Sequence, residues 1–204
     1  MASSFPYFQQ PHPEITTHPY LDPALREILL RKVPSDVLDR LDADLIPFGD
    51  RTLLPHGDIA KLSEAIRLPS QVPTFTKYSA FGEYKDELWT CPAWQELHRI
   101  AAREGLIAIG YERASGEYSR LHQFLKLLAF APVSGVVSCP LAMTDGAARL
   151  IEQLRLDPSE PGNAEVTAEL RQCFQRFTTR CPDSFWTSGQ WMTERTGGSD
   201  LGRT

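Results

Sequence analysis

The 204-residue sequence has no excess of basic residues. Lysine and arginine number 21 against 26 aspartate and glutamate residues, which gives a formal net charge of −5. A protein that follows a phosphate backbone needs a basic face, so this balance makes nucleic acid an unlikely partner for this part of the molecule. Hydrophobic residues make up 42% of the chain and charged residues 23%. These values are typical of globular proteins and exclude the disordered and fibrous classes.

Cysteine is scarce, and neither cysteine nor histidine is clustered. Four cysteines and five histidines are scattered along the chain, and no CxxC spacing occurs. A zinc site needs ligands at short, regular spacings. We therefore predict free thiols and no metal site.

Long hydrophobic runs are also missing. No apolar stretch approaches the length that crosses a bilayer, and residues 1–5 lack the basic and apolar regions of a secretory signal. We expect an intracellular protein in a reducing compartment and no membrane partner. The sequence leaves the choice between cytoplasm, mitochondrion and peroxisome open.

Residues 1–21 are predicted to form a proline-rich and aromatic N-terminal arm. Pro6, Pro11 and Pro13 keep the first part of this arm out of a helix. Its aromatic residues would pack on a neighbouring surface, with a loosely ordered terminus as the alternative.

Residues 22–181 are predicted to form an all-helical domain, because apolar residues recur at helical spacing between capping residues and prolines. Asp22 followed by Pro23 and Ser35 are typical starts, and Gly105 is a typical end. The predicted helices cover residues 22–32, 35–47, 58–68, 90–104, 118–131, 136–156 and 164–177.

Two of these helices are expected to form a buried central pair. Leu121, Phe124 and Leu128 belong to an apolar set that covers most of the circumference of helix 118–131, which predicts burial on more than one side. Small residues in helix 136–156 would permit close packing of its neighbour. Residues 74–82 alternate aromatic and polar side chains, which fits a short strand or a loop, and Gly82 favours the loop.

Past Pro182 the pattern changes. Residues 184–193 are rich in aromatic and hydroxyl side chains with a period near two, which predicts a strand and the start of a second domain over residues 182–204. The turn Gly197-Gly198-Ser199-Asp200 follows. Glycine admits positive φ and has no Cβ, so this backbone could lie against a flat or phosphorylated cofactor, although the same residues also make ordinary turns.

The helical domain, the strand and the residues Met192-Thr193-Glu194 and Gly197-Gly198-Ser199-Asp200 together resemble the acyl-CoA dehydrogenase family. Residues 8–13, 92–94, 105–113 and 139–147 resemble its adaptive-response, AidB-like branch, so the resemblance covers essentially the whole chain. It implies a mainly α fold, with an N-terminal helical domain of the acyl-CoA dehydrogenase type followed by the first strand of a truncated β-barrel middle domain.

The resemblance implies FAD as the cofactor and acyl-CoA as the substrate. Thr193 and Ser199 would also meet the substrate. Donors directed at the flavin ring would stabilise its reduced form, and glycine N–H groups would bind anionic oxygens. Arg195 and Thr196 depart from the family pattern, which often has Pro-Gly there. The residues matching the family's cofactor-binding positions are Gln190, Trp191, Met192, Thr193, Gly197, Gly198 and Ser199.

The implied activity is α,β-dehydrogenation of an acyl-CoA thioester. The family's catalytic carboxylate belongs to a C-terminal bundle outside this sequence, so we assign no catalytic residue and expect the chain to be inactive alone. Glu112 is expected to be a salt-bridged surface residue and Asp145 a structural acid within a helix. The resemblance also implies a homo-oligomer or association with full-length family members. Alternatives are a non-catalytic helical interaction module or remnant, or part of an alkylation-response flavoprotein.

Overall fold

Helices account for most of the chain in the computed structural model, which describes residues 15–53, 56–154, 163–200 and 202. The mainly α fold is confirmed. The α-helices are α1 (Pro23–Lys32), α2 (Ser35–Asp50), α3 (Asp58–Ile66), α4 (Pro92–Arg103), α5 (Ala108–Glu112), α6 (Ser119–Phe130), α7 (Ser138–Gln153) and α8 (Asn163–Phe177). Short 3₁₀ turns cover Pro19–Leu21, Pro69–Gln71, Gly116–Tyr118 and Ala131–Val133, and the two strands are β1 (Thr74–Tyr78) and β2 (Tyr84–Trp89).

The helix ends follow the predicted signals. The Asp22 carboxylate accepts the N–H groups of Ala24 and Leu25, each at 3.0 Å, and so caps α1. Gly105 takes φ +65 where α4 ends. Helix α2 continues past Pro47 to Asp50, further than predicted, although Pro47 lacks the N–H that would donate to the carbonyl four residues before it.

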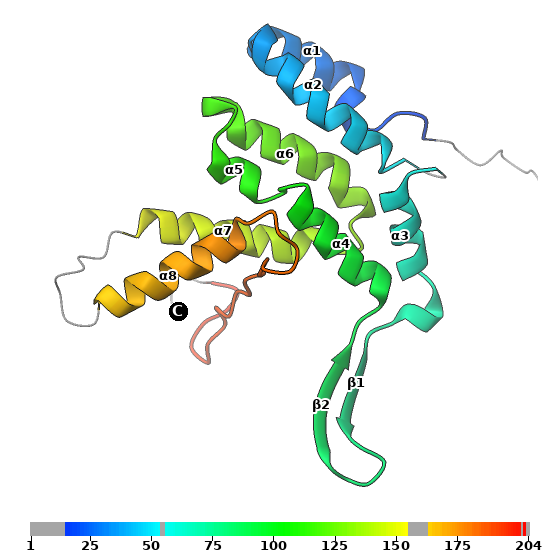
Figure 1. Ribbon diagram of the computed structural model, residues 1–204, viewed down its shortest axis with the longest axis vertical. Helices are drawn as coiled ribbons and strands as arrows, with labels where there is room; N and C mark the ends of the chain where they lie inside the picture. The colour runs from blue at the N-terminus through cyan, green and yellow to red at the C-terminus, as the bar shows by residue number, and fades with distance from the viewer. Residues whose placement is uncertain (1–14, 54–55, 155–162, 201, 203–204) are drawn as a thin grey trace, which may run out of the picture.

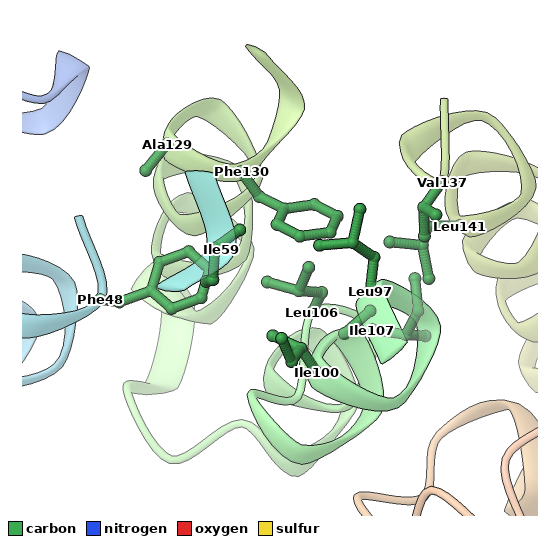
Figure 2. Packing of buried hydrophobic residues seen from close by; sticks show 11 residues of the cluster. Phe48, Ile59, Leu97, Ile100, Leu106, Ile107, Ala129, Phe130, Val137 and Leu141 are labelled. Atoms are coloured by element: carbon green, nitrogen blue, oxygen red, sulfur yellow. The ribbon is translucent and has the colours of Figure 1, made fainter. Parts of the chain in front are cut away.

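Two apolar clusters hold the helices together. The first lies among α3, α4, α6 and α7, where Leu97 of α4 and Phe130 of α6 point toward one another (Figure 2). The second joins α1, α2 and the turn at Tyr20 to Leu125 of α6. Since α2 and α6 contribute side chains to both clusters, they connect the two parts of the core.

The predicted burial of α6 on more than one side is confirmed, because Phe130 lies in the first cluster and Leu125 in the second. The exposed residues of this helix are Phe124, at 59%, and Leu128, at 44%. The apolar set therefore extends further around the helix than its buried face does. Ile28 of α1 is exposed, because α1 lies at the edge of the molecule with a single helix, α2, packed beside it (Figure 1).

Of the two readings for residues 74–82, the favoured loop is wrong and the short strand is correct, since Thr74–Tyr78 form β1. A β-hairpin therefore interrupts the helical region 22–181. Strands β1 and β2 pair antiparallel, with Phe75 opposite Leu88 and Tyr78 opposite Tyr84. Gly82 takes φ +83 in the turn between the strands, so it shapes the hairpin instead of preventing it. The hairpin extends away from the helices (Figure 1).

The strand predicted after Pro182 does not form. Residues 184–193 are extended without a ladder, and an isolated bridge joins Glu194 to Gly197. A strand needs a neighbour for its backbone groups, and this segment has none within the part of the chain that the structure describes. The domain boundary at residue 182 stays a prediction.

The end of the predicted N-terminal arm packs into the helical body. His18 is 1% exposed and Tyr20 is fully buried, with its hydroxyl donating to Asp42. The aromatic segment at residues 5–13 lies outside the described residues. Among the helices that are described, none combines the length and the apolar character needed to cross a membrane.

Candidate functional site

The segment that carries the predicted cofactor residues is anchored to α7 and α8. The Ser188 N–H donates to the Thr144 hydroxyl oxygen at 2.8 Å, and that hydroxyl donates to the Pro140 carbonyl at 2.7 Å. Further back, the Trp186 N–H donates to the Arg176 carbonyl at 3.1 Å, and the Arg176 guanidinium lies 4.4 Å from the centre of the Trp186 ring. These contacts hold the chain leading into residues 190–199 beside the helices (Figure 1).

Helix α7 presents a surface of small residues beside this segment. Cys139, Ala142 and Gly146 are exposed and share one helix face. A Cβ at Gly146 would lie 3.8 Å from the side-chain amide of Gln190. Sequence analysis assigned these small residues to helix packing, so it missed their position next to Gln190. The one feature of the sequence that indicates this surface is the small residue at every third or fourth position of α7.

The predicted glycine turn forms a tight chain reversal. The Glu194 N–H donates to the Gly197 carbonyl at 2.8 Å. A Cβ at Gly198 would stand 3.0 Å from the methyl group of Thr193, so a side chain there would displace Thr193. Neither Gly197 nor Gly198 is among the described glycines with positive φ. Close approach to Thr193, and not positive φ, therefore favours glycine at position 198.

The predicted cofactor residues lie on the surface. Trp191 is 94% exposed and Met192 is 50% exposed. Two surface cavities of about 380 and 570 Å³ lie elsewhere, one lined by Ile151 of α7 and Phe174 of α8 and the other by Arg113 and Arg149, and none of the seven predicted residues lines them. The Trp191 and Met192 side chains are therefore open to solvent.

The two acidic residues of the family-like segments are both neutralised by arginine. Glu112 receives two hydrogen bonds from Arg180, at 2.6 and 2.7 Å, which lower its pKa. The predicted salt bridge of Glu112 is confirmed, with Arg180 as the partner in place of the adjacent Arg113. Asp145 of α7 accepts from Arg120 at 2.6 Å. The lowered pKa makes the Glu112 carboxylate a weak base.

A second cluster of charges lies inside the helical body. Lys126 is 1% exposed, and its ammonium group donates to Asp44 at 2.7 Å and lies 3.0 Å from Glu104. His122 contacts the same Asp44 carboxylate at 2.7 Å. Burial alone would raise the pKa of Asp44, but the hydrogen bonds from His122 and Lys126 lower it to about 2. This cluster ties α2 to α6 and to the residue after α4, which is a structural role.

These features define the class of protein: a helical domain of the acyl-CoA dehydrogenase type whose last helices carry an extended segment with a Thr-Glu and Gly-Gly-Ser-Asp turn. Residues 10–165 match the family described as the adaptive response protein AidB N-terminal domain. The chain belongs to this family, as the sequence resemblance predicted.

Relatives of known structure share the fold over nearly the whole chain. Acyl-CoA dehydrogenase family member 11 of Caenorhabditis elegans is 39% identical over 186 residues, which are 90% of this chain and 28% of that protein. The crystal structure of Caenorhabditis elegans ACDH-11 in complex with C11-CoA matches with a TM-score of 0.80 and 36% identity, covering 98% of this chain and 32% of that one.

The apo form of Bd2924 matches with a TM-score of 0.78 and 35% identity, over 96% of this chain and 36% of that chain. The chain thus spans about a third of the length of the relatives it matches.

Proposed function

We propose that this chain is the N-terminal part of an FAD-dependent acyl-CoA dehydrogenase-like oxidoreductase, and that residues 190–199 form one wall of its flavin site. The observation that carries the proposal is the anchoring of this segment on α7, through Ser188 and Thr144, which presents Trp191 and Met192 to solvent beside a glycine turn. Membership of the family supports FAD as the group that would cover this surface.

Some residues of this surface would contact the flavin, and others would contact the acyl-CoA substrate. Trp191 and Met192 offer apolar area to a flat ring, and the turn at Gly197 and Gly198 offers backbone N–H groups to anionic oxygens. Thr193 and Ser199 offer hydroxyl groups toward an acyl-CoA. When bound, the flavin would supply hydride acceptance for α,β-dehydrogenation of the acyl thioester.

We expect this chain alone to lack turnover. Removal of the α-proton requires a basic carboxylate beside the substrate. Glu112 is bound by Arg180 and Asp145 by Arg120, so neither is available as that base. The relative crystallised with C11-CoA supports an acyl-CoA as the ligand class for the whole protein.

Flavin titration tests the proposal. FAD should bind the 204-residue chain, measured as quenching of flavin fluorescence and as flavin absorbance that stays with the protein in gel filtration. Trp191→Ala should weaken binding about tenfold, because a stacked aromatic ring contributes about 1–2 kcal/mol. Trp89→Ala is the matched control, since Trp89 is an exposed tryptophan of β2 outside the segment that carries the proposed site, and should leave the affinity unchanged.

A chain that elutes colourless and fails to quench flavin would contradict flavin binding and favour the helical interaction module. Equal affinities for the wild type and Trp191→Ala would place the flavin elsewhere on the molecule. Acyl-CoA binding, followed by calorimetry in the presence of FAD, should fall for Thr193→Val and Ser199→Ala if these hydroxyl groups meet the substrate.

A further inference from the structure

Tyr111 of α5 contacts the three helices that follow it in the chain. Its ring stands at 90° to the ring of Phe174 in α8, with the two ring centres 5.4 Å apart. The Arg120 guanidinium of α6 lies 4.5 Å from the centre of the Tyr111 ring. The Tyr111 hydroxyl donates to the backbone carbonyl of Asp145 in α7 at 2.7 Å. Burial raises the pKa of Tyr111 to about 12, so this hydroxyl keeps its proton and remains a donor at neutral pH.

The bond from Tyr111 reaches α7 next to the residue that holds the candidate site. Asp145 directly follows Thr144, whose hydroxyl oxygen accepts the Ser188 N–H at 2.8 Å. Thr144 is fully buried, and its hydroxyl donates to the Pro140 carbonyl at 2.7 Å, which fixes the direction of its side chain. The position of Ser188 therefore depends on where this part of α7 lies.

Helix α6 also holds Asp145, but through the side chain. Arg120 and Gln123 donate to the Asp145 carboxylate at 2.6 and 3.2 Å. A carboxylate turns about its side-chain bonds, so these two contacts tolerate a small shift of α7. The carbonyl oxygen is part of the helix backbone, so a bond to it tolerates less. Tyr111 is thus the contact that fixes the backbone of α7 beside Thr144.

We propose that Tyr111 is a positioning residue for the segment at residues 190–199. Through the Asp145 carbonyl it sets the position of α7, and therefore of the Thr144 hydroxyl that holds the segment at Ser188. The inference rests on the proposed function only for the identity of the ligand, since the path from Tyr111 to Ser188 consists of protein groups alone.

The residue after Tyr111 holds the start of the same chain segment. Glu112 accepts two hydrogen bonds from Arg180, at 2.6 and 2.7 Å. The Arg180 guanidinium packs closely on Gly105, where an added Cβ would lie 2.5 Å from its carbon. Helix α5 is therefore tied to this part of the chain at two points, directly at Arg180 and through α7 at Ser188.

Hydrogen exchange of the Ser188 N–H, followed by NMR on the 204-residue chain without ligand, tests the coupling. Tyr111→Phe removes the hydroxyl and keeps the ring, so the contacts of the ring with Phe174 and Arg120 should remain. Exchange at Ser188 should accelerate about fivefold, the factor that corresponds to the loss of one hydrogen bond. Exchange at Ile100, within α4, should stay unchanged. Equal acceleration at both N–H groups would show a general loss of stability and would overturn the proposal.

Tyr118→Phe is the matched control. Tyr118 is also half-buried, but it packs against the second apolar cluster, and its hydroxyl bonds to no residue that the structure describes. This variant should leave exchange at Ser188 as it is in the wild type. An acceleration as large as that of Tyr111→Phe, or no acceleration by Tyr111→Phe itself, would contradict the positioning role.

Flavin affinity gives a second measurement. Tyr111→Phe should weaken FAD binding about threefold, less than Trp191→Ala, because Tyr111 acts through other residues. In a Thr144→Val background Tyr111→Phe should add nothing, since the path to Ser188 is already broken, and additive losses would overturn this path. A wild type that binds no FAD would contradict the proposed function, and exchange at Ser188 would then decide the positioning role by itself.

Discussion

Lys126 is a single buried residue whose charge requires specific partners in the interior of the molecule. Its buried ammonium group contacts two partly exposed carboxylates, those of Asp44 and Glu104, and lies 4.9 Å from the ring centre of Phe48. A buried charge is tolerated only when its partners are in place, and removing one partner costs more than the pair itself contributes. Local sequence patterns do not predict this cluster, because its members lie up to 82 residues apart.

Asp44→Asn should lower the free energy of unfolding by about 2–3 kcal/mol at neutral pH. This is below the usual cost of breaking a buried pair because the Asp44 side chain is 36% exposed and Glu104 remains beside Lys126. Denaturant unfolding measures the change. Asp36→Asn, which removes an exposed pair with Arg40, is the control and should change stability by less than about 0.5 kcal/mol.

The stability difference between the wild type and Asp44→Asn should also depend on pH. The Asp44 pKa is about 2 in the folded chain against an ordinary value of 3.8. A lowered folded-state pKa stabilises the fold at pH values above the ordinary one, and this contribution is lost as pH falls through the folded value. The difference between the wild type and Asp44→Asn should therefore shrink between about pH 4 and pH 2. A difference that stays constant over this range would show that Asp44 titrates normally.

The sequence was enough to predict which residues belong to the candidate site, but not which residues of the helices they contact. The glycines and hydroxyl residues of the segment identified the family. Thr144, which fixes the segment through Ser188, lies 44 residues away in a helix and gave no signal in the sequence. A hydrogen bond between a buried hydroxyl and a distant backbone N–H depends on the packing of whole helices, which local spacing does not report.

At the scale of elements, the helices were predictable because each one carries its own apolar stripe and ending signals. The hairpin was not, since its polar and aromatic residues alternate without a buried face, and a strand pattern is recognised by one-sided burial. The strand expected at residues 184–193 fails for the opposite reason. Its composition suits a strand, but pairing requires a neighbour, which composition cannot supply.

The connection between α6 and α7 contains a strained residue. Val136 takes φ +71 and is 74% exposed, so its side chain gains little packing in return for a conformation that a β-branched residue disfavours. Val136→Asn should raise the free energy of unfolding by about 1 kcal/mol, because asparagine tolerates this region. Thermal unfolding gives the measurement.

Val166→Asn is the comparison for this substitution, because Val166 is an exposed valine within α8. It should leave stability unchanged or reduce it by a few tenths of a kcal/mol, as helix propensity requires. An equal gain at both positions would mean that the benefit comes from surface polarity and not from backbone strain.

For the molecule as a whole, the question is whether its two apolar clusters form one folding unit. Helix α2 places Leu41 and Leu45 in one cluster and Phe48 in the other, and α6 likewise supplies Leu125 to one and Phe130 to the other. The contact between Lys126 and Asp44 joins the same two helices. Disruption of either cluster should therefore loosen the other.

Leu41→Ala tests this coupling, because Leu41 is fully buried in the cluster that does not include α4. The cavity should lower the free energy of unfolding by about 2–4 kcal/mol. If the body unfolds cooperatively, hydrogen exchange should accelerate by the same factor in α4, around Leu97 and Ile100, as in α2. Protection in α4 that survives Leu41→Ala would instead show two independently stable halves, with α2 and α6 as a hinge between them.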